Sequence, residues 1–244
     1  MNTKTALITG AARRIGAGTA RSLHAAGYNL ALHYLSSVAE AQVLADDLNQ
    51  LRNNSAQLVQ ADLRRTEKLA PMIEQVAGIW GRLDVLINNA SSFYPTPMGT
   101  ATEQHWDELL GSNLKAAFFL SQAAVPYLCE RGGSIVNIVD IHAERGLKNY
   151  PVYSIAKAGL AAMTRALAKE LGPEIRVNGV APGAILWPEH DMDGAKQAEI
   201  LARIPLRRKG EPGDVARAVL FLVENAPYVT GQILAVDGGR SLFN

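Results

Sequence analysis

The sequence predicts a single α/β domain built on a doubly wound parallel sheet. Short apolar runs rich in β-branched residues alternate with helical stretches along the whole chain, which is the pattern of a sheet covered by helices on both faces. The fourth run, LDVLIN, reads as a strand that is buried on both sides. The first run leads through a glycine-bearing turn into a helix. Together these observations indicate a Rossmann-type three-layer αβα sandwich.

The elements follow one another in regular order. We expect strands at residues 5–9, 29–34, 56–60, 83–88, 134–140, 175–180 and 233–236. Helices are expected near residues 16–27, 38–53, 68–80, 103–129, 153–171 and 214–223. Residues 184–205 are less regular and predict a substrate loop over a site. No repeat or linker divides the chain, so we expect residues 1–244 to form one domain.

Composition narrows the function classes. Lys and Arg number 24 and Asp and Glu 23, and this net charge of +1 argues against nucleic acid or a membrane surface as a partner. The single cysteine, Cys129, excludes a disulfide within the chain. The start, MNTKTALITG, enters a strand directly, and no stretch is long enough to span a bilayer. We therefore expect a cytoplasmic protein without a membrane partner or a metal site.

One short segment brings together three groups that can move protons. Tyr153 and Lys157 are four residues apart and share one face of a helix. The run SIVNIVD places Asp140 at the end of the preceding strand. An ammonium beside a phenol favours the phenolate and lowers its pKa, which makes Tyr153 a candidate acid or base. Alone, however, a Tyr and a Lys at this spacing are more often ordinary surface residues.

The first turn is a candidate phosphate-binding site. Turn amides and an exposed helix N-terminus attract phosphate, and small residues let the ligand approach. An ordinary glycine turn used for close packing gives the same pattern. The candidate residues of this turn are Gly10, Arg13, Arg14, Ile15 and Gly16.

The end of the second strand indicates which dinucleotide fits. Many dinucleotide folds place a carboxylate here to bind the ribose 2′-hydroxyl, but this chain has none before Glu40. Arginine and hydroxyl side chains suit a 2′-phosphate instead. His33 has the alternative interpretation of a histidine whose hydrogen bonds are satisfied within the fold. The candidate residues at this strand end are His33, Tyr34, Ser36 and Ser37.

Small polar residues follow the fourth strand, where ligands bind in open α/β sheets. They are Asn89, Ala90 and Ser91, and Phe93 comes directly after them. Phe93 is placed either to stack on a flat ring or to pack against the protein. Asn113 lies in an otherwise apolar helical stretch and must find partners, as a structural hydrogen-bonder or as part of a water path.

These motifs, in this order, resemble those of the short-chain dehydrogenase/reductase family across essentially the whole chain. The resemblance rests on Thr9-Gly10 with Gly16, Asp62-Leu63, Asn88-Asn89-Ala90, Asn113, Tyr153 with Lys157, Pro182-Gly183 and Asp237-Gly238-Gly239. It implies a nicotinamide cofactor and a homotetramer. It also implies cofactor contacts from Asp62, Leu63, Asn89, Ala90, Ser91, Tyr153, Lys157, Pro182 and Gly183.

Two departures from the family pattern resemble the pteridine reductases. Asp140 stands where the family has a catalytic serine, and Arg14 stands at the middle glycine of the turn. With the Ser-Ser-Phe-Tyr-Pro segment they imply NADPH as cofactor and a pterin or folate as substrate. The resemblance further implies substrate contacts from Arg14, Ser91, Phe93, Asp140 and Tyr153. In one position, Ser36, the chain lacks an arginine that the subfamily carries near the 2′-phosphate.

The expected activity is NADPH-dependent reduction of a pterin, of the dihydrobiopterin, biopterin or dihydrofolate type, to its tetrahydro form. In this interpretation Tyr153 donates the proton, Lys157 anchors the ribose, Asp140 orients Tyr153 and Asn113 holds a water. A carboxylate at position 140 would repel the oxyanion that forms on a ketone, whereas a ring nitrogen that gains a proton has no such conflict. The alternatives are a carbonyl reductase, such as a 3-oxoacyl reductase, and a non-catalytic nucleotide sensor.

Overall fold

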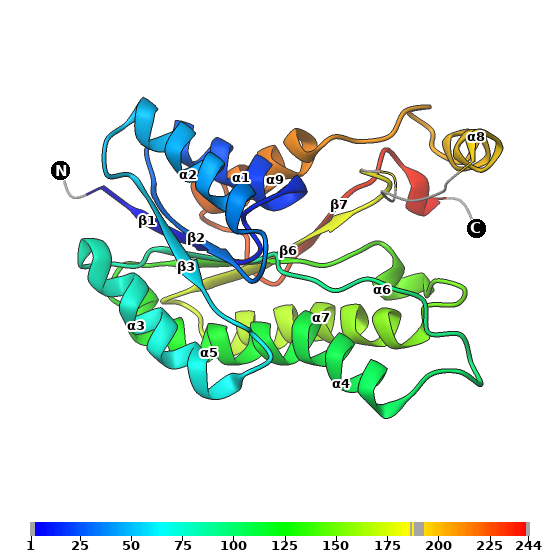
Figure 1. The fold of residues 1–244 in the computed structure, drawn as a ribbon, viewed down its shortest axis with the longest axis horizontal. Coiled ribbons are helices and arrows are strands. Elements are labelled where there is room, and N and C mark those ends of the chain that lie inside the picture. Colours follow the sequence, from blue (N-terminus) through cyan, green and yellow to red (C-terminus); the bar gives the residue numbers. More distant parts are fainter. Residues whose placement is uncertain (1–2, 186, 188–192, 243–244) are drawn as a thin grey trace.

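The computed structural model describes residues 3–185, 187 and 193–242, and its strands form one seven-stranded parallel sheet (Figure 1). The sheet order is β3-β2-β1-β4-β5-β6-β7, with parallel pairing at each of its six interfaces. The predicted doubly wound α/β fold is therefore confirmed. The strands are β1 (Thr5–Ile8), β2 (Asn29–Tyr34), β3 (Ala56–Gln60), β4 (Val85–Asn88), β5 (Ser134–Ile138), β6 (Arg176–Pro182) and β7 (Ile233–Val236).

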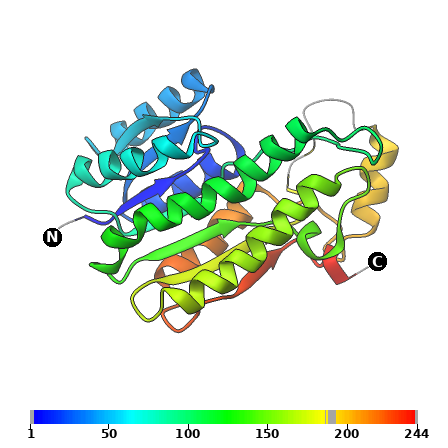
Figure 2. The same ribbon diagram turned by 90° about the horizontal axis from the view of Figure 1, so that it is seen from below.

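Helices form a layer on each face of the sheet. One layer holds α1 (Arg14–Ala25), α2 (Val38–Leu51) and α9 (Pro212–Glu224) (Figure 1). The other holds α3 (Leu69–Trp80), α5 (Ala116–Cys129) and α7 (Pro151–Glu170), which lie in front of the sheet in Figure 2 together with α4 (Glu103–Leu110). Two short helices, α6 (His142–Arg145) and α8 (Gly194–Ala202), lie beyond the carboxyl ends of the strands. None of the described helices is long and apolar enough to span a membrane.

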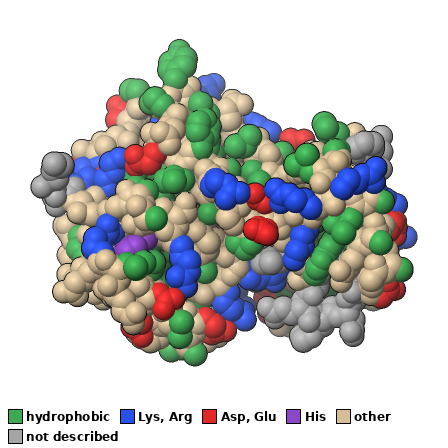
Figure 3. All heavy atoms as spheres, turned by 90° about the horizontal axis from the view of Figure 1, so that it is seen from above, with side chains coloured by type: hydrophobic (Ala, Val, Ile, Leu, Met, Phe, Trp, Pro, Cys, Tyr) green, Lys and Arg blue, Asp and Glu red, His purple; other side chains and the backbone are tan. Residues whose placement is uncertain are grey.

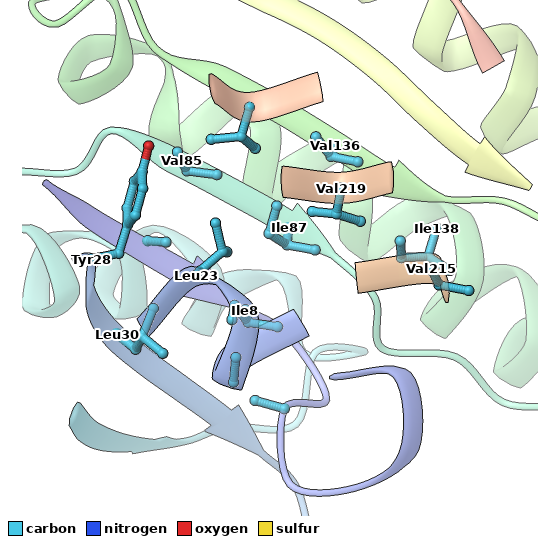
Figure 4. Close-up of a cluster of buried hydrophobic side chains, with 14 of the residues drawn as sticks. Ile8, Leu23, Tyr28, Leu30, Val85, Ile87, Val136, Ile138, Val215 and Val219 are labelled. Carbon is cyan, nitrogen blue, oxygen red and sulfur yellow. The ribbon is translucent and has the colours of Figure 1, made fainter. Parts of the chain in front are cut away.

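Successive side chains along the buried strands point to opposite faces of the sheet, and each face has its own hydrophobic core. In β4, Val85 and Ile87 pack into one apolar cluster while Leu86, between them, packs into the other. Figure 4 shows the first cluster, where side chains of α1 and α9 meet those of the sheet. Because both faces of each central strand are buried, the sheet is rigid where its strands end.

The sheet reverses its order at β1, and this reversal positions the site. β1 pairs with β2 on one side and with β4 on the other. The strands that follow β1 in sequence are therefore added first on one side of it and, from β4 onwards, on the opposite side. A crevice opens beyond the carboxyl ends of such strands, and ligands of open α/β sheets bind there. The turn after β1, the loop after β4 and the loop after β5 all reach this crevice.

The predicted helix over residues 103–129 is interrupted. The structure instead has α4, a π-helical turn η2 (Gly111–Lys115) and then α5. The side chain of Ser112 donates to the Glu108 carbonyl, and that of Asn113 donates to the Leu109 carbonyl. Two carbonyls thus bond to side chains, which favours the wider turn. Hydrophobic periodicity does not reveal such a local competition.

Two further boundaries differ from the prediction. β5 ends at Ile138 rather than at residue 140, so Asp140 lies in the turn that follows the strand. The expected irregular loop at residues 184–205 contains α8, whose first turn is capped by the Asp193 carboxylate. Residues 186 and 188–192 of that predicted loop lie outside the described part of the chain.

Candidate active site

A cleft of about 1190 Å³ opens beyond the carboxyl ends of the strands. It brings together almost every residue that the sequence singled out. These are Gly10, Arg13, Arg14, Ile15, Gly16, His33, Tyr34, Ser36, Ser37, Asp62, Leu63, Asn89, Ala90, Ser91, Phe93, Asp140, Tyr153, Lys157, Pro182 and Gly183. Asn113 is the exception among the predicted residues and lies behind the wall of the cleft.

A hydrogen bond between two side chains forms the centre of the cleft. The Tyr153 hydroxyl donates to Asp140 Oδ2 at 2.8 Å. The other carboxylate oxygen of Asp140 accepts from the backbone N–H of His142, also at 2.8 Å. The Asp140 carboxylate therefore caps the turn that follows β5 with one oxygen and holds the Tyr153 hydroxyl with the other. The turn after β5 fixes Asp140, and the first turn of α7 fixes Tyr153.

The expected lowering of the Tyr153 pKa is wrong for this structure. Burial raises the pKa of Tyr153, and the charge and hydrogen bond of Asp140 raise it further. Lys157 Nζ lies 5.8 Å from the centre of the Tyr153 ring. Tyr153 is therefore a neutral phenol at physiological pH, with a proton on its hydroxyl, rather than a phenolate.

Lys157 is fully enclosed at the base of the cleft. Its ammonium donates to the Ile138 carbonyl at 2.8 Å, at the very end of β5. Burial lowers the pKa of Lys157 to about 8, and the Asp140 carboxylate acts in the opposite direction. The bond to Ile138 ties α7 to the strand and fixes the height of Tyr153 one turn away.

Asn113 holds the loop after β4 in place. Its amide nitrogen donates to the carbonyls of Ser92 and Leu109 at 3.0 and 2.9 Å, and its oxygen accepts from Ser91 Oγ at 2.5 Å. The side chain thus joins the π-turn η2 to the loop that forms one wall of the cleft. Its structural role as a hydrogen-bonder is visible, and a water path remains an expectation.

Aromatic rings form the wall opposite Asp140. The Phe93 ring stacks on Tyr150 at 4.6 Å between centroids with 11° between their planes. It meets Tyr153 edge-on at 4.8 Å and 79°. Phe93 is still 51% exposed, so a flat molecule can reach it. Sequence reasoning missed Tyr150, although Pro151 at the first position of α7 marks where that helix begins.

The turn after β1 fits a pyrophosphate. Gly10 has φ 61°, and a Cβ on Gly16 would lie 2.2 Å from the Gly10 carbonyl, so both positions require glycine. No side chain caps the first turn of α1, and none of its residues is acidic. Its amides are therefore available to an anion. Arg14 has φ 55°, in the left-handed region, at a position where glycine would be unstrained.

His33 supports this turn from below. Its Nδ1 accepts from the Gly10 N–H at 3.1 Å, and its Nε2 lies 3.1 Å from the Ala61 carbonyl. Burial lowers its pKa, which keeps the ring neutral and able to accept at Nδ1. Both ring nitrogens are thus bound to backbone, as in the structural interpretation of this residue. His33 connects the turn after β1 to the end of β3.

The end of the cleft beside β2, where the adenosine of a cofactor is expected to lie, is called the adenosine end. Its charged side chains are partly paired with one another. The guanidinium of Arg13 lies 3.6 Å from Glu40 at the surface. Asp62 is bound by Arg64, which also approaches Glu108 at 3.7 Å. Glu108 in turn accepts from the Tyr94 hydroxyl at 3.0 Å. Ser36 and Ser37 lie at the open end of β2, beside these charges.

The last two predicted residues, Pro182 and Gly183, line the cleft at the end of β6. A Cβ on Gly183 would come within 2.6 Å of Asp237 Cβ, which explains the glycine. Several lining residues were not predicted because nothing in their local sequence marks them. They include Arg64, Glu108, His142, Leu147, Lys148, Lys196, Arg203 and Arg240. Among the described residues, no group of three or more His, Cys, Asp or Glu side chains could hold a metal ion.

Comparison with known proteins agrees with this geometry. The model of a family described as Enoyl-(Acyl carrier protein) reductase matches residues 10–241. Pteridine reductase 1 of Leishmania tarentolae is 38% identical, over 97% of this chain and 96% of that protein. The chain belongs to the short-chain dehydrogenase/reductase family. The 3-oxoacyl-[acyl-carrier-protein] reductase FabG of Staphylococcus aureus is also similar, at 35% identity over 97% of this chain and 98% of that protein.

Membership of the short-chain dehydrogenase/reductase family makes the chain an oxidoreductase that uses a nicotinamide cofactor. The resemblance predicted from the motif order is confirmed. Identities of 38% and 35% are comparable, so sequence similarity by itself does not separate pterins from acyl thioesters as substrates.

The pKa of Lys157 leads to a prediction about stability. Because the pKa falls from 10.5 to about 8 in the folded protein, burying the ammonium destabilises the fold below pH 8. That cost is relieved as the pH rises towards 10.5. Lys157→Met removes it, so the difference in free energy of unfolding between variant and wild type should shift towards the wild type by up to about 3 kcal/mol from pH 7 to pH 10.5.

Urea unfolding at both pH values measures this difference. Lys169→Met, at the exposed end of the same helix, is the matched control and should show no such pH dependence. A constant difference for Lys157→Met across the range would contradict the lowered pKa.

Proposed function

We propose that the protein reduces a dihydropterin to its tetrahydro form, with NADPH as the hydride donor. The observation that carries the proposal is the hydrogen bond between Tyr153 and Asp140. The similarity to Pteridine reductase 1 supports it. When bound, the nicotinamide supplies a hydride to a ring carbon, and the chain's own residues supply the proton and the geometry.

Tyr153 is proposed to donate the proton to a ring nitrogen. Its raised pKa keeps the phenol protonated until a basic atom of the substrate takes the proton. Asp140, 2.8 Å away, accepts the hydrogen bond of the hydroxyl and so orients it. After the transfer, the phenolate regains its proton from water that enters the open cleft. Lys157 holds the base of the cleft and is proposed to anchor the cofactor ribose.

The carboxylate of Asp140 favours a pterin over a ketone. Reduction of a ketone builds negative charge on an oxygen beside Tyr153, and a carboxylate hydrogen-bonded to that phenol would repel it. A ring nitrogen that takes up its proton before the hydride arrives carries no such charge. Phe93, open on its outer side, is proposed to stack on the pterin, with Ser91 and Arg14 contacting its polar edge.

A carbonyl reductase of the 3-oxoacyl type is the second candidate, because FabG of Staphylococcus aureus is similar over nearly the whole chain. A non-catalytic nucleotide sensor is disfavoured by the buried Lys157 and by the hydrogen bond between Tyr153 and Asp140. Burying an ammonium destabilises a fold, and a chain that only sensed nucleotides would have no reason to retain it.

Asp140→Ser tests the substrate class. Loss of the carboxylate beside Tyr153 should lower kcat for a dihydropterin by roughly 10²–10⁴, the usual worth of a positioned proton-transfer group. Trace reduction of ketones should rise in the same variant. Turnover of dihydrobiopterin and of a 3-oxoacyl thioester, together with the melting temperature, is measured on one preparation.

Asp214→Ser is the control, because Asp214 also accepts from a backbone N–H but lies outside the lining of the cleft. It should lose stability without losing kcat. Unchanged pterin turnover in Asp140→Ser, with a lower melting temperature, would reduce Asp140 to a cap and favour the carbonyl reductase.

NADPH is proposed as the preferred cofactor, because no carboxylate follows β2 before Glu40 and Arg14 lies in the adjacent turn. We expect kcat/KM to be higher with NADPH than with NADH. If the Arg14 guanidinium reaches the 2′-phosphate, Arg14→Ala should lower kcat/KM for NADPH about tenfold more than for NADH, as loss of a charge-assisted hydrogen bond would. If it contacts the pterin or the pyrophosphate instead, the two values should fall alike. Arg21→Ala is the control, since Asp47 holds that guanidinium at 2.8 Å. Equal values with the two cofactors would refute this preference.

A homotetramer is proposed on the basis of family resemblance and of exposed apolar side chains. Members of the family usually associate through the helix that bears Tyr153 and Lys157 and the helix before it, here α7 and α5. Phe118 on α5 is 40% exposed and Ile155 on α7 is 48% exposed. Gly159 on α7 packs within the chain, because a Cβ there would meet Leu114 at 2.6 Å. Light scattering at micromolar concentration should give the mass of four chains. Phe118→Lys should lower that mass, whereas Phe221→Lys on α9 should not.

A further inference from the structure

Arg240 lies at the edge of the cleft, just after β7. It starts the short helix η3 (Arg240–Leu242) and lines the same cleft as Tyr153 and Asp140. The side chain is partly buried, and burial lowers its pKa; Asp140 and Asp237 raise it, whereas the like charge of Arg203 lowers it. A guanidinium in this position is costly unless something neutralises it.

The two nearest carboxylates are already bound elsewhere. Asp140 accepts from Tyr153 and from the His142 N–H. Asp237 accepts from the backbone N–H groups of Gly239 and Ser241 at 2.9 and 2.6 Å. Among the described residues, none forms a hydrogen bond or an ion pair with the Arg240 guanidinium. Its donors are therefore free and face the cleft.

Further positive charge lies at the same end of the cleft. Lys196 on α8 and Arg203, directly after that helix, also line it. Arg203 is paired with Glu199 at 2.7 Å, so it adds less free charge than Arg240. Figure 3 shows several Lys and Arg side chains near the middle of one face, with Asp and Glu side chains among them.

This cationic end is separate from the adenosine end. Arg13, Ser36 and Ser37 lie beside β2, the second strand from one edge of the sheet, whereas Arg240 follows β7 at the opposite edge. The proposed proton donor, Tyr153, lies between them on α7. An anion bound by Arg240 therefore belongs to the substrate rather than to the 2′-phosphate of a cofactor.

We propose that Arg240 binds an anionic group, a carboxylate or a phosphate, carried on the side chain of the pterin substrate. The guanidinium offers a planar pair of donors that suits either group. The proposal rests on the pterin activity proposed above and makes Arg240 a specificity-determining residue. It predicts that pterins with an anionic tail are bound more tightly than neutral ones.

The test compares three substrates with saturating NADPH. Dihydrofolate carries carboxylates, dihydroneopterin monophosphate carries a phosphate, and dihydrobiopterin is neutral. Arg240→Gln should raise KM for the two anionic pterins at least tenfold more than KM for dihydrobiopterin, because a charge-assisted hydrogen bond is lost. Arg240→Lys, which keeps the charge without the planar fork, should recover part of the effect. A response to one of the two anionic substrates alone identifies which anion the site takes.

Arg165→Gln removes an equal charge outside the cleft and should change none of the three KM values. An equal change for all three pterins, no change for any, or a raised KM for NADPH in Arg240→Gln would each overturn the assignment. Failure of the wild type to reduce any pterin would instead remove the proposed function, and the inference with it. Circular dichroism of each variant separates these outcomes from misfolding.

Discussion

The hydrogen bond between a phenol and a carboxylate at the end of β5 is the interaction that the rest of the cleft supports. A neutral Tyr153 beside Asp140 keeps its proton at physiological pH, because burial and the carboxylate both oppose its loss. It can therefore give the proton only to a strongly basic atom, such as one that becomes basic as a hydride arrives at its neighbour. The buried ammonium of Lys157 is tied to the Ile138 carbonyl instead of neutralising the carboxylate directly. The chemistry available at this point is delivery of a proton to a basic atom.

Backbone geometry sets the position of these side chains. The central strands are buried on both faces, so their carboxyl ends cannot shift independently. Asp140 leaves β5 through a turn closed by its own bond to His142, and α7 returns Tyr153 to it. On the other side, the π-turn at Asn113 directs a side chain out of α4 and α5 towards the loop after β4. Local irregularities thus occur where the site needs polar groups.

The sequence predicted the fold and most of the cleft, because strand ends in a parallel sheet converge whatever their distance along the chain. The sequence could not predict contacts between side chains that only the folded chain brings together. The pKa of Tyr153 was expected to fall, yet the desolvation and the carboxylate that raise it depend on burial and orientation. Periodicity missed the π-turn because side chains bind two helical carbonyls there. Arg240 directly follows the Asp237-Gly238-Gly239 motif, but that motif assigns it no role, and only the folded sheet brings it to the cleft.

The amide of Asn113 also fixes the polarity of one point on the wall of the cleft. Because its nitrogen donates to two backbone carbonyls, its oxygen must face Ser91 and takes the hydroxyl proton of that serine. The Ser91 oxygen then has only lone pairs to offer to the cleft. A ligand that presents an N–H at this point donates a hydrogen bond to Ser91 Oγ. A ligand that presents a carbonyl there is repelled, because its oxygen and Ser91 Oγ face each other with no proton between them. The wall therefore distinguishes the two edges of a heterocycle by the direction of a single proton.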